Sequence, residues 1–203
     1  MDKPADSMYP IHELLRKRWS PRAFSSRPVE REKIFTLFEA ARWSPSAANS
    51  QPWHFIIASR DEDVEAYSKL TEALTERNRL WSKGVPLLVL TVAQTGREDG
   101  KPSPWALYDL GQSVAHLSVQ ATALGLFVHQ MAGFDREEAR SLFEIPEGFD
   151  PVSVVAIGYY GSVDDLPPEF RDREIEARTR KPLHEFLHHG GWKTALLEPE
   201  LAN

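Results

Sequence analysis

The sequence predicts a mixed fold in which helices cover both faces of one β-sheet. Helical and strand-like patterns alternate along the 203 residues, and such alternation favours a sheet between layers of helices. Two apolar segments run almost without interruption, which is typical of strands buried on both faces. Hydrophobic residues make up 41% of the chain, enough for the core of one domain spanning residues 1–203.

The first half of the chain predicts three helices and two strands. Pro10 suits the first position of a short helix that ends near Arg18, with Ile11, Leu14 and Leu15 as its buried face. The spacing of apolar residues indicates two further helices and two strands. These helices are expected over residues 29–43 and 62–76, and the strands over residues 54–59 and 85–93.

The second half predicts the longest helix, over residues 106–124. This helix carries so little charge that we expect cover on more than one side, either as a central core helix or at a dimer interface. Short strands at 127–130 and 151–160 flank a helix at 135–143 that starts with a capping-box pattern. After the core (about residues 10–160), the charged segment 161–203 predicts an extended tail that packs on the domain or on a partner subunit.

Composition excludes several classes of function. The chain has 24 Lys and Arg against 30 Asp and Glu, a net charge of -6, which argues against nucleic acid as a partner. It contains no cysteine, so a redox role requires a bound cofactor. Its first residues lack the apolar stretch of a signal peptide, and no apolar segment approaches membrane-spanning length. We therefore expect a cytoplasmic protein with no membrane partner.

The polar loop Ser44-Pro45-Ser46-Ala47-Ala48-Asn49-Ser50-Gln51-Pro52 is the first candidate for a binding site. It lies between a predicted helix and a predicted strand and contains many hydrogen-bonding side chains. Such a loop can line a site for a flat ligand with polar edges. The alternative is an ordinary turn, because Ser, Pro and Asn are common turn residues.

A second candidate is the alternating segment Arg18-Trp19-Ser20-Pro21-Arg22. In an extended backbone, residues 18, 20 and 22 point to one side. Two guanidinium groups and a hydroxyl on one side suit an anion, particularly a phosphate. A distant basic cluster, residues 178–181, could converge on the same phosphate. The alternative is that both clusters are solvated surface charges.

Five motifs in order resemble the nitroreductase family of flavin enzymes. They are Arg-x-Ser-x-Arg at 18–22, the Ser-Pro-Ser…Asn-Ser-Gln-Pro-Trp loop at 44–53, Leu-Gly-Leu at 124–126 leading to Gly-Phe-Asp at 133–135, the strand ending at Gly158, and Arg-x-Arg-Lys-Pro at 178–182. The resemblance implies an α+β fold, an α/β/α sandwich with a mainly antiparallel central sheet. It also implies a homodimer with FMN in the cleft between subunits.

The resemblance assigns residues to FMN by position. The phosphate and the ring edge fall to Arg18, Trp19, Ser20 and Arg22, with Arg178 and Arg180 reaching the phosphate from the C-terminal side. The loop that meets the ring from the partner subunit corresponds to Pro45, Ser46, Ala47 and Asn49. Asn78 corresponds to an amide near the pyrimidine edge, and the backbone facing the reactive ring corresponds to Gln130, Met131, Ala132 and Gly133.

Three positions depart from the family pattern. Many nitroreductases have Glu where this chain has Ala132, and some have Lys near the flavin where this chain has Trp81. Trp19 takes a position that often holds a smaller or more polar residue. The first departure removes a carboxylate but leaves the backbone N–H of that residue.

The resemblance implies an oxidoreductase that takes hydride from NADH or NADPH. It would reduce nitroaromatics, quinones or similar electron-poor small molecules in a ping-pong sequence. The flavin supplies the chemistry, so no protein side chain is expected to be catalytic. The alternatives are an FMN-dependent dehydrogenase or dehalogenase on the same scaffold, or a flavin-binding module without turnover.

A zinc hydrolase is the remaining alternative, because His184-Glu185-Phe186-Leu187-His188 matches the His-Glu-x-x-His pattern. On a helix, this spacing places two imidazoles on one face with a carboxylate beside them. The only late candidates for a third ligand are Glu198 and Glu200. The motif lies in the tail rather than in the predicted core, so we expect no metal site.

Overall fold

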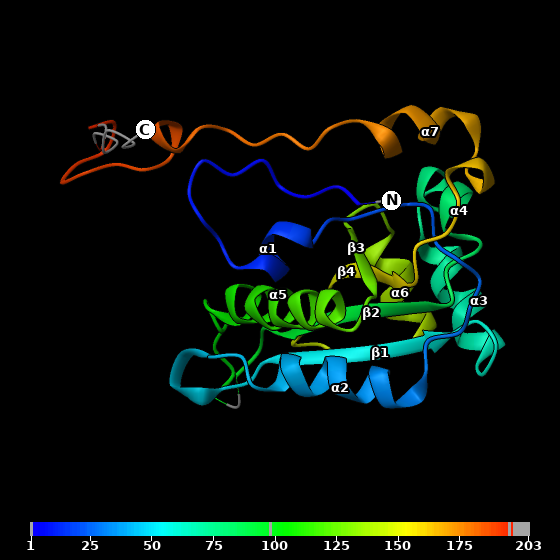
Figure 1. The fold of residues 1–203 in the computed structure, drawn as a ribbon. Coiled ribbons are helices and arrows are strands. Elements are labelled where there is room, and N and C mark those ends of the chain that lie inside the picture. Colours follow the sequence, from blue (N-terminus) through cyan, green and yellow to red (C-terminus); the bar gives the residue numbers. More distant parts are fainter. Residues whose placement is uncertain (1, 98, 195, 197–203) are drawn as a thin grey trace.

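A four-stranded antiparallel sheet forms the centre of the molecule (Figure 1). The computed structural model describes residues 2–97, 99–194 and 196. The strands lie in the order β1 (Trp53–Ser59), β2 (Leu87–Gln94), β4 (Phe149–Gly158) and β3 (Phe127–Met131). Every neighbouring pair is antiparallel. The predicted α+β sandwich and its four strands are therefore confirmed.

The central strand β2 is buried on both faces, as its apolar sequence predicted. Successive side chains of a strand point to opposite faces, so β2 contributes to two cores. Leu88, Leu90 and Val92 pack in one hydrophobic cluster, and Leu87, Val89 and Ala93 pack in the other. Strand β4 divides its side chains in the same way.

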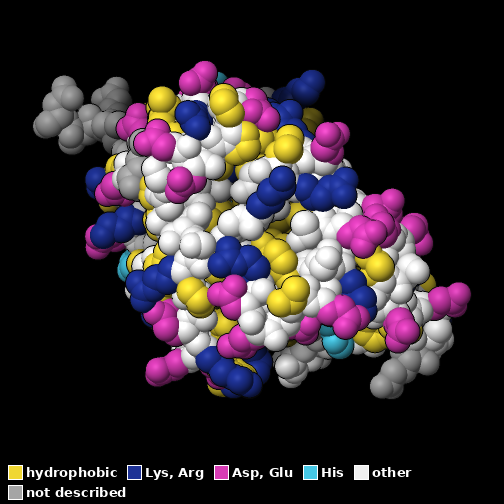
Figure 2. All heavy atoms as spheres, turned by 90° about the vertical axis from the view of Figure 1, so that its right-hand side faces the viewer, with side chains coloured by type: hydrophobic (Ala, Val, Ile, Leu, Met, Phe, Trp, Pro, Cys, Tyr) yellow, Lys and Arg dark blue, Asp and Glu magenta, His cyan; other side chains and the backbone are white. Residues whose placement is uncertain are grey.

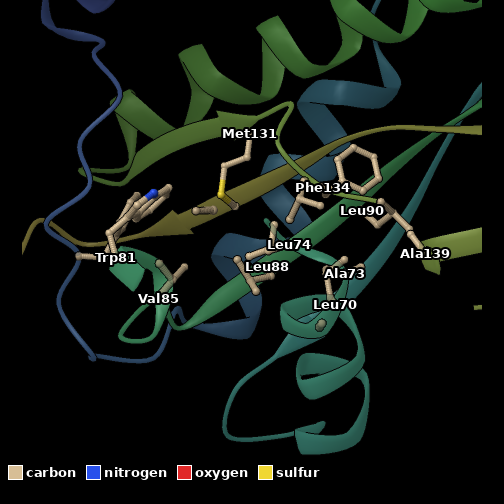
Figure 3. Packing of buried hydrophobic residues seen from close by; sticks show 14 of the residues in the cluster. Leu70, Ala73, Leu74, Trp81, Val85, Leu88, Leu90, Met131, Phe134 and Ala139 are labelled. Atoms are coloured by element: carbon tan, nitrogen blue, oxygen red, sulfur yellow. The ribbon is translucent and has the colours of Figure 1, made fainter. Parts of the chain in front are cut away.

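The two clusters correspond to two layers of helices. Helices α2 (Arg31–Arg42) and α5 (Ala106–Ala123) supply one cluster, with Leu37 and Leu117 as fully buried members. Helices α3 (Val64–Ala73), α4 (Glu76–Ser82), α6 (Arg136–Leu142) and α7 (Pro168–Ile175) contribute to the other. Figure 3 shows this second cluster, where Trp81 of α4 and Met131 of β3 lie above Leu88 of β2.

The predicted helix at residues 62–76 corresponds to α3, which ends at Ala73, and the separate helix α4 that follows it was not predicted. The backbone at Leu74 forms a β-bridge with Phe134, and the N–H of Thr75 donates to the carbonyl of Gly133 at 3.0 Å. The N–H of Asp135 donates to the carbonyl of Ala73 at 2.8 Å. These contacts between distant segments replace the next helical turn, so the periodicity of the sequence could not reveal the break.

Helix α7 was not predicted, and it packs against the same chain. Leu166, Phe170 and Glu174 are 4%, 2% and 1% exposed. Beyond α7, the chain runs along the molecule past α1 (Glu13–Lys17) toward its C-terminal end (Figure 1). Among the described residues after α7, the only helical element is a single turn, η3 (Leu183–Glu185). Packing of this later part on a partner subunit remains a prediction.

Two helices expose apolar side chains. The predicted buried face of α1 is wrong for the single chain, because Ile11 and Leu15 are 43% and 47% exposed. In α5, Leu107 and Tyr108 are 56% and 67% exposed, while the opposite side is buried. Among the described residues, no helix combines the length and apolar character needed to cross a membrane.

Candidate cofactor site

A cavity of about 250 Å³ lies where three distant segments meet. The N-terminal segment, the loop after α1 and the end of α7 all contribute. Its lining comprises Lys3, Arg18, Trp19, Ser20, Arg22, Arg173, Glu174, Glu176, Ala177, Arg178, Thr179 and Arg180. The structure therefore brings together the two basic clusters that the sequence suggested could converge on one anion.

The cavity concentrates positive charge in partly buried surroundings. Burial lowers the pKa of Arg18, and the charge of Arg180 lowers it further. Burial also lowers the pKa of Arg178, followed by the charges of Arg18 and Arg180. The charged form of each guanidinium is thus disfavoured by desolvation and by its neighbours, and the attraction of a bound anion would offset both effects. Figure 2 shows the end of the molecule that carries α4 and α7, where Lys and Arg side chains lie among exposed hydrophobic ones.

The loop that carries Arg18 and Arg22 is held in place by aromatic and backbone contacts. Trp19 is 5% exposed, and its ring packs edge-on against Phe127 at 5.8 Å between centroids. The Nζ of Lys3 lies 4.8 Å from the centre of the Trp19 ring. The imidazole Nδ1 of His129 lies 2.8 Å from the carbonyl oxygen of Pro21. Trp19 therefore reaches the cavity only at its edge.

His129 is kept neutral at this position. Burial lowers its pKa to about 4, and the charge of Arg22 acts in the same direction. A neutral imidazole can donate one hydrogen bond, and the nearby carbonyl of Pro21 accepts it. The ring also packs against Trp81, with 4.7 Å between centroids. His129 is a structural support for the loop.

Segment 130–133 is fixed to α4 by its last carbonyl. The oxygen of Gly133 accepts from the backbone N–H of Thr75 at 3.0 Å and from Asn78 Nδ2 at 2.9 Å. Asn78 Oδ1 in turn accepts from Trp81 Nε1 at 3.2 Å. A Cβ on Gly133 would lie only 2.8 Å from Asn78 Nδ2, so glycine permits this close approach. Both the Nδ2 and the Oδ1 of Asn78 are thus hydrogen-bonded within the protein.

The side chains of this segment alternate between surface and core. Gln130 and Ala132 are exposed, whereas Met131 is 2% exposed and belongs to the core cluster. The side chain of Met131 therefore cannot contact a ligand, and any contact of this residue would use its backbone. Trp81 is 5% exposed, so its indole is a core side chain.

The polar loop at residues 44–52 has an unusual backbone. Ala48, Asn49 and Gln51 adopt left-handed conformations, with φ of 52°, 55° and 47°. The N–H of Ala47 donates to the buried carboxylate of Asp109 at 3.0 Å, and the N–H of Gln51 donates to Ser46 Oγ at 3.0 Å. Non-glycine residues adopt this conformation rarely, and strained backbone of this kind clusters at functional sites.

The structure does not bring this loop to the basic cavity of the same chain. Pro45, Ala47 and Asn49 are exposed, and Ser46 is half-buried. In Figure 1 the loop lies beyond the end of α2, at the edge of the molecule away from α4 and α7. The two parts of the predicted site are therefore separate within one chain, and any joint site requires a second subunit.

The His-Glu-x-x-His segment does not form the helix that a zinc site needs. Only Leu183–Glu185 forms a 3-10 turn, so His184 and His188 do not share one helical face. His188 instead packs against Trp192, with 4.8 Å between ring centroids. Within residues 2–97, 99–194 and 196, no group of three His, Cys, Asp or Glu residues could hold a metal ion. Glu198 and Glu200 lie outside the described residues.

Four residues at these places were not singled out from the sequence. Lys3 and Arg173 line the cavity, Glu174 holds the arginine loop, and Asp109 holds the polar loop. The spacing of Phe170 and Glu174 by one helical turn was the available signal for α7. Lys3 gave no signal, because its role depends on the two ends of the chain meeting.

Two curated relatives match most of this chain. An uncharacterized 15.4 kDa protein of Mycolicibacterium smegmatis is 32% identical over 148 residues, covering 70% of this chain and 99% of that protein. A protein of Archaeoglobus fulgidus with the provisional name NADH dehydrogenase/NAD(P)H nitroreductase is 30% identical over 151 residues, covering 72% and 83%.

Solved structures extend the likeness over nearly the whole chain. A crystal structure described as an oxidoreductase containing FMN superposes with a TM-score of 0.87 at 33% identity, covering 93% of this chain and 96% of that one. A nitroreductase family protein from Clostridium difficile 630 gives a TM-score of 0.68 at 26% identity, covering 88% and 96%. The Nitroreductase family model matches residues 15–159. The chain belongs to the nitroreductase family.

Proposed function

We propose that this protein is an FMN-dependent oxidoreductase that takes hydride from NADH or NADPH and reduces nitroaromatics, quinones or similar small molecules. The observation that carries the proposal is the cavity in which Arg18, Arg22, Arg178 and Arg180 converge. The names of two relatives support it, since one contains FMN and the other is provisionally an NAD(P)H nitroreductase.

The cavity residues fit the phosphate of FMN. Arg guanidinium groups bind phosphate through paired N–H donors, and each such charge-assisted bond contributes about 1.5–3 kcal/mol. Arg18 and Arg22 approach from the loop after α1, and Arg178 and Arg180 approach from the C-terminal side. Burial and neighbouring guanidinium groups lower the pKa values of Arg18 and Arg178. Lowered pKa values of this kind are expected at a site that binds an anion.

The remaining residues would support the ring. When bound, FMN supplies the hydride chemistry, with one substrate leaving before the next arrives. The chain's part is to bind and orient the cofactor. The end of segment 130–133 is anchored because the carbonyl of Gly133 accepts from Thr75 and Asn78. Ala132 is exposed and carries no carboxylate that would compete for the ligand. No side chain here is assigned a proton transfer.

We also propose a homodimer in which the polar loop of one subunit completes the cavity of the other. The loop is exposed, strained and distant from the cavity of its own chain. Apolar residues on α1 and α5, including Leu15, Leu107 and Tyr108, are exposed in the single chain and would be covered. Sedimentation measurements test this: a monomer with full FMN occupancy would contradict the shared site.

A visible absorption spectrum of the purified protein is the first test of the cofactor. We expect a flavin spectrum and release of about one FMN per subunit on denaturation. A colourless protein that refuses added FMN would contradict the proposal. Steady-state oxidation of NADH and NADPH with a quinone or a nitroaromatic then separates an enzyme from a flavin-binding module, which would bind FMN without turnover.

A further inference from the structure

We propose that Glu174 is a positioning residue of the basic cavity, which fixes the backbone of Arg22 so that its guanidinium meets the bound anion. The inference rests on the proposed function, where that anion is the phosphate of FMN. Glu174 lies in α7, beyond the residues 15–159 that match the family model. It thus concerns a part of the chain that the family match does not describe.

The contacts of Glu174 are unusual for an acidic residue that lines a cavity. Its side chain is 1% exposed. Both carboxylate oxygens accept the N–H of Arg22 at 3.0 Å, and Oε1 also accepts the N–H of Ala23 at 3.1 Å. A buried carboxylate is costly unless it is hydrogen-bonded, and here backbone donors satisfy it. The carboxylate therefore acts as a fixed clamp on residues 22 and 23.

The same residue joins the N-terminal segment to the clamp. The backbone carbonyl of Glu174 accepts from Lys3 Nζ at 2.7 Å. The carbonyl of Lys3 accepts from Arg178 Nη1 at 2.9 Å. Lys3, Arg22 and Arg178 all line the cavity, and each is connected to Glu174 directly or through one neighbour. Displacement of Glu174 would shift cationic groups from all three segments.

This role predicts an effect opposite to simple electrostatics. A negative charge beside a site for anions should weaken binding, so its removal should strengthen binding. If Glu174 positions Arg22, its removal should weaken binding instead. Glu176 is the matched control, because it also lines the cavity and is exposed. Within the described residues, its carboxylate makes no hydrogen bond or salt bridge.

The experiment compares Glu174→Gln and Glu176→Gln in the full-length apoprotein after FMN removal. Glutamine preserves the shape of Glu174 but turns one acceptor into an NH₂ group facing the N–H of Arg22. We expect Glu174→Gln to weaken FMN binding about tenfold, the loss of one charge-assisted bond. Glu176→Gln should bind FMN more tightly than the wild type, because it removes a negative charge beside the cavity without removing a hydrogen bond. Riboflavin, which lacks the phosphate, should bind both variants as it binds the wild type.

Hydrogen exchange provides a readout that does not depend on FMN. In the wild-type apoprotein, the amides of Arg22 and Ala23 should be protected, and in Glu174→Gln they should exchange much faster. If Glu174→Gln does not fold, Glu174→Asp replaces it, because the shorter carboxylate keeps the charge but not the reach. It should show the same loss specific to FMN.

Three outcomes would overturn the inference. They are equal FMN affinity of Glu174→Gln and Glu176→Gln, equal losses of FMN and riboflavin binding in Glu174→Gln, or unprotected amides at 22 and 23 in the wild type. Failure of the proposed function looks different: the wild-type apoprotein would refuse FMN but bind inorganic phosphate in calorimetry. The phosphate affinities of the two variants would then decide the role of Glu174.

Discussion

The arginine loop (residues 18–23) and the polar loop (residues 44–52) each accept support from one buried carboxylate. They differ in whether they face a cavity of their own chain. Glu174 holds the first loop, and Asp109 of α5 holds the second. The first loop presents its charges to a cavity that its own chain completes. The second adopts left-handed backbone and is exposed. In the proposed homodimer, the second loop would meet its ligand only at the cavity of the other subunit.

Loss of the arginines should have the largest effect and should act on the first loop only. We expect Arg18→Ala/Arg22→Ala to lower FMN affinity by about two orders of magnitude or more, since each charge-assisted bond contributes about 1.5–3 kcal/mol. Fluorescence titration of FMN into the apoprotein measures this. The control is Arg31→Ala, an exposed position in α2 that should leave the affinity unchanged. An unchanged FMN affinity in the double variant would show that this cavity does not bind the FMN phosphate.

Acid should destabilise the first loop more than the second. Burial holds the pKa of His129 at about 4, below its ordinary 6.5, so the neutral form is favoured in the folded protein. The stabilisation is fully present above pH 6.5 and is lost as the pH falls toward 4. A shift of this size corresponds to about 3 kcal/mol.

Urea unfolding at pH 7 and pH 4.5 measures the acid effect. His129→Gln should reduce the difference between the two pH values, because the amide does not titrate. His116→Gln is the control, since His116 is exposed beside Ser44 of the second loop. Equal pH dependence in all three proteins would contradict the assignment to His129.

Removing the carboxylate of Asp109 should destabilise the second loop, which this carboxylate holds. Asp109 is 2% exposed, and its loss leaves the N–H of Ala47 without its acceptor. We expect Asp109→Ala to cost about 1–3 kcal/mol of unfolding free energy, and Asp109→Asn to recover part of it because one oxygen remains. Chemical denaturation gives these values. Equal losses in both variants would indicate that the charge, and not the hydrogen bond, holds the loop.

The smallest effect is expected at Ala48, where the left-handed backbone is strained. Glycine adopts this conformation without the steric penalty, so Ala48→Gly should stabilise the protein by about 0.5–1 kcal/mol. The matched control is Ala115→Gly in α5, which should destabilise it by about 1 kcal/mol. Thermal unfolding compares the two. A destabilised Ala48→Gly protein would show that the loop is not strained in solution.

Local patterns predicted the sheet but not the anchors of the site. The four strands followed from apolar runs and the α5 core from its periodicity, because these signals lie within one segment. The break at Leu74 depends on pairing with Phe134, and the clamp at Glu174 depends on contact with residue 22. Such contacts join positions far apart in the chain, so composition and spacing carry no trace of them. The two arginine clusters were visible, and their convergence was only one of two interpretations.

The meeting of Lys3 and Arg180 at one cavity also sets an order of events during synthesis. A growing chain can form β1, β2 and the helices between them long before residue 180 of the 203 is made. The cavity proposed to bind the phosphate cannot form until α7 and the residues after it have left the ribosome. If FMN binds there as proposed, cofactor loading is among the last steps of maturation. Ribosome-bound chains stalled before residue 173 should not quench flavin fluorescence, and chains stalled well beyond the full domain should.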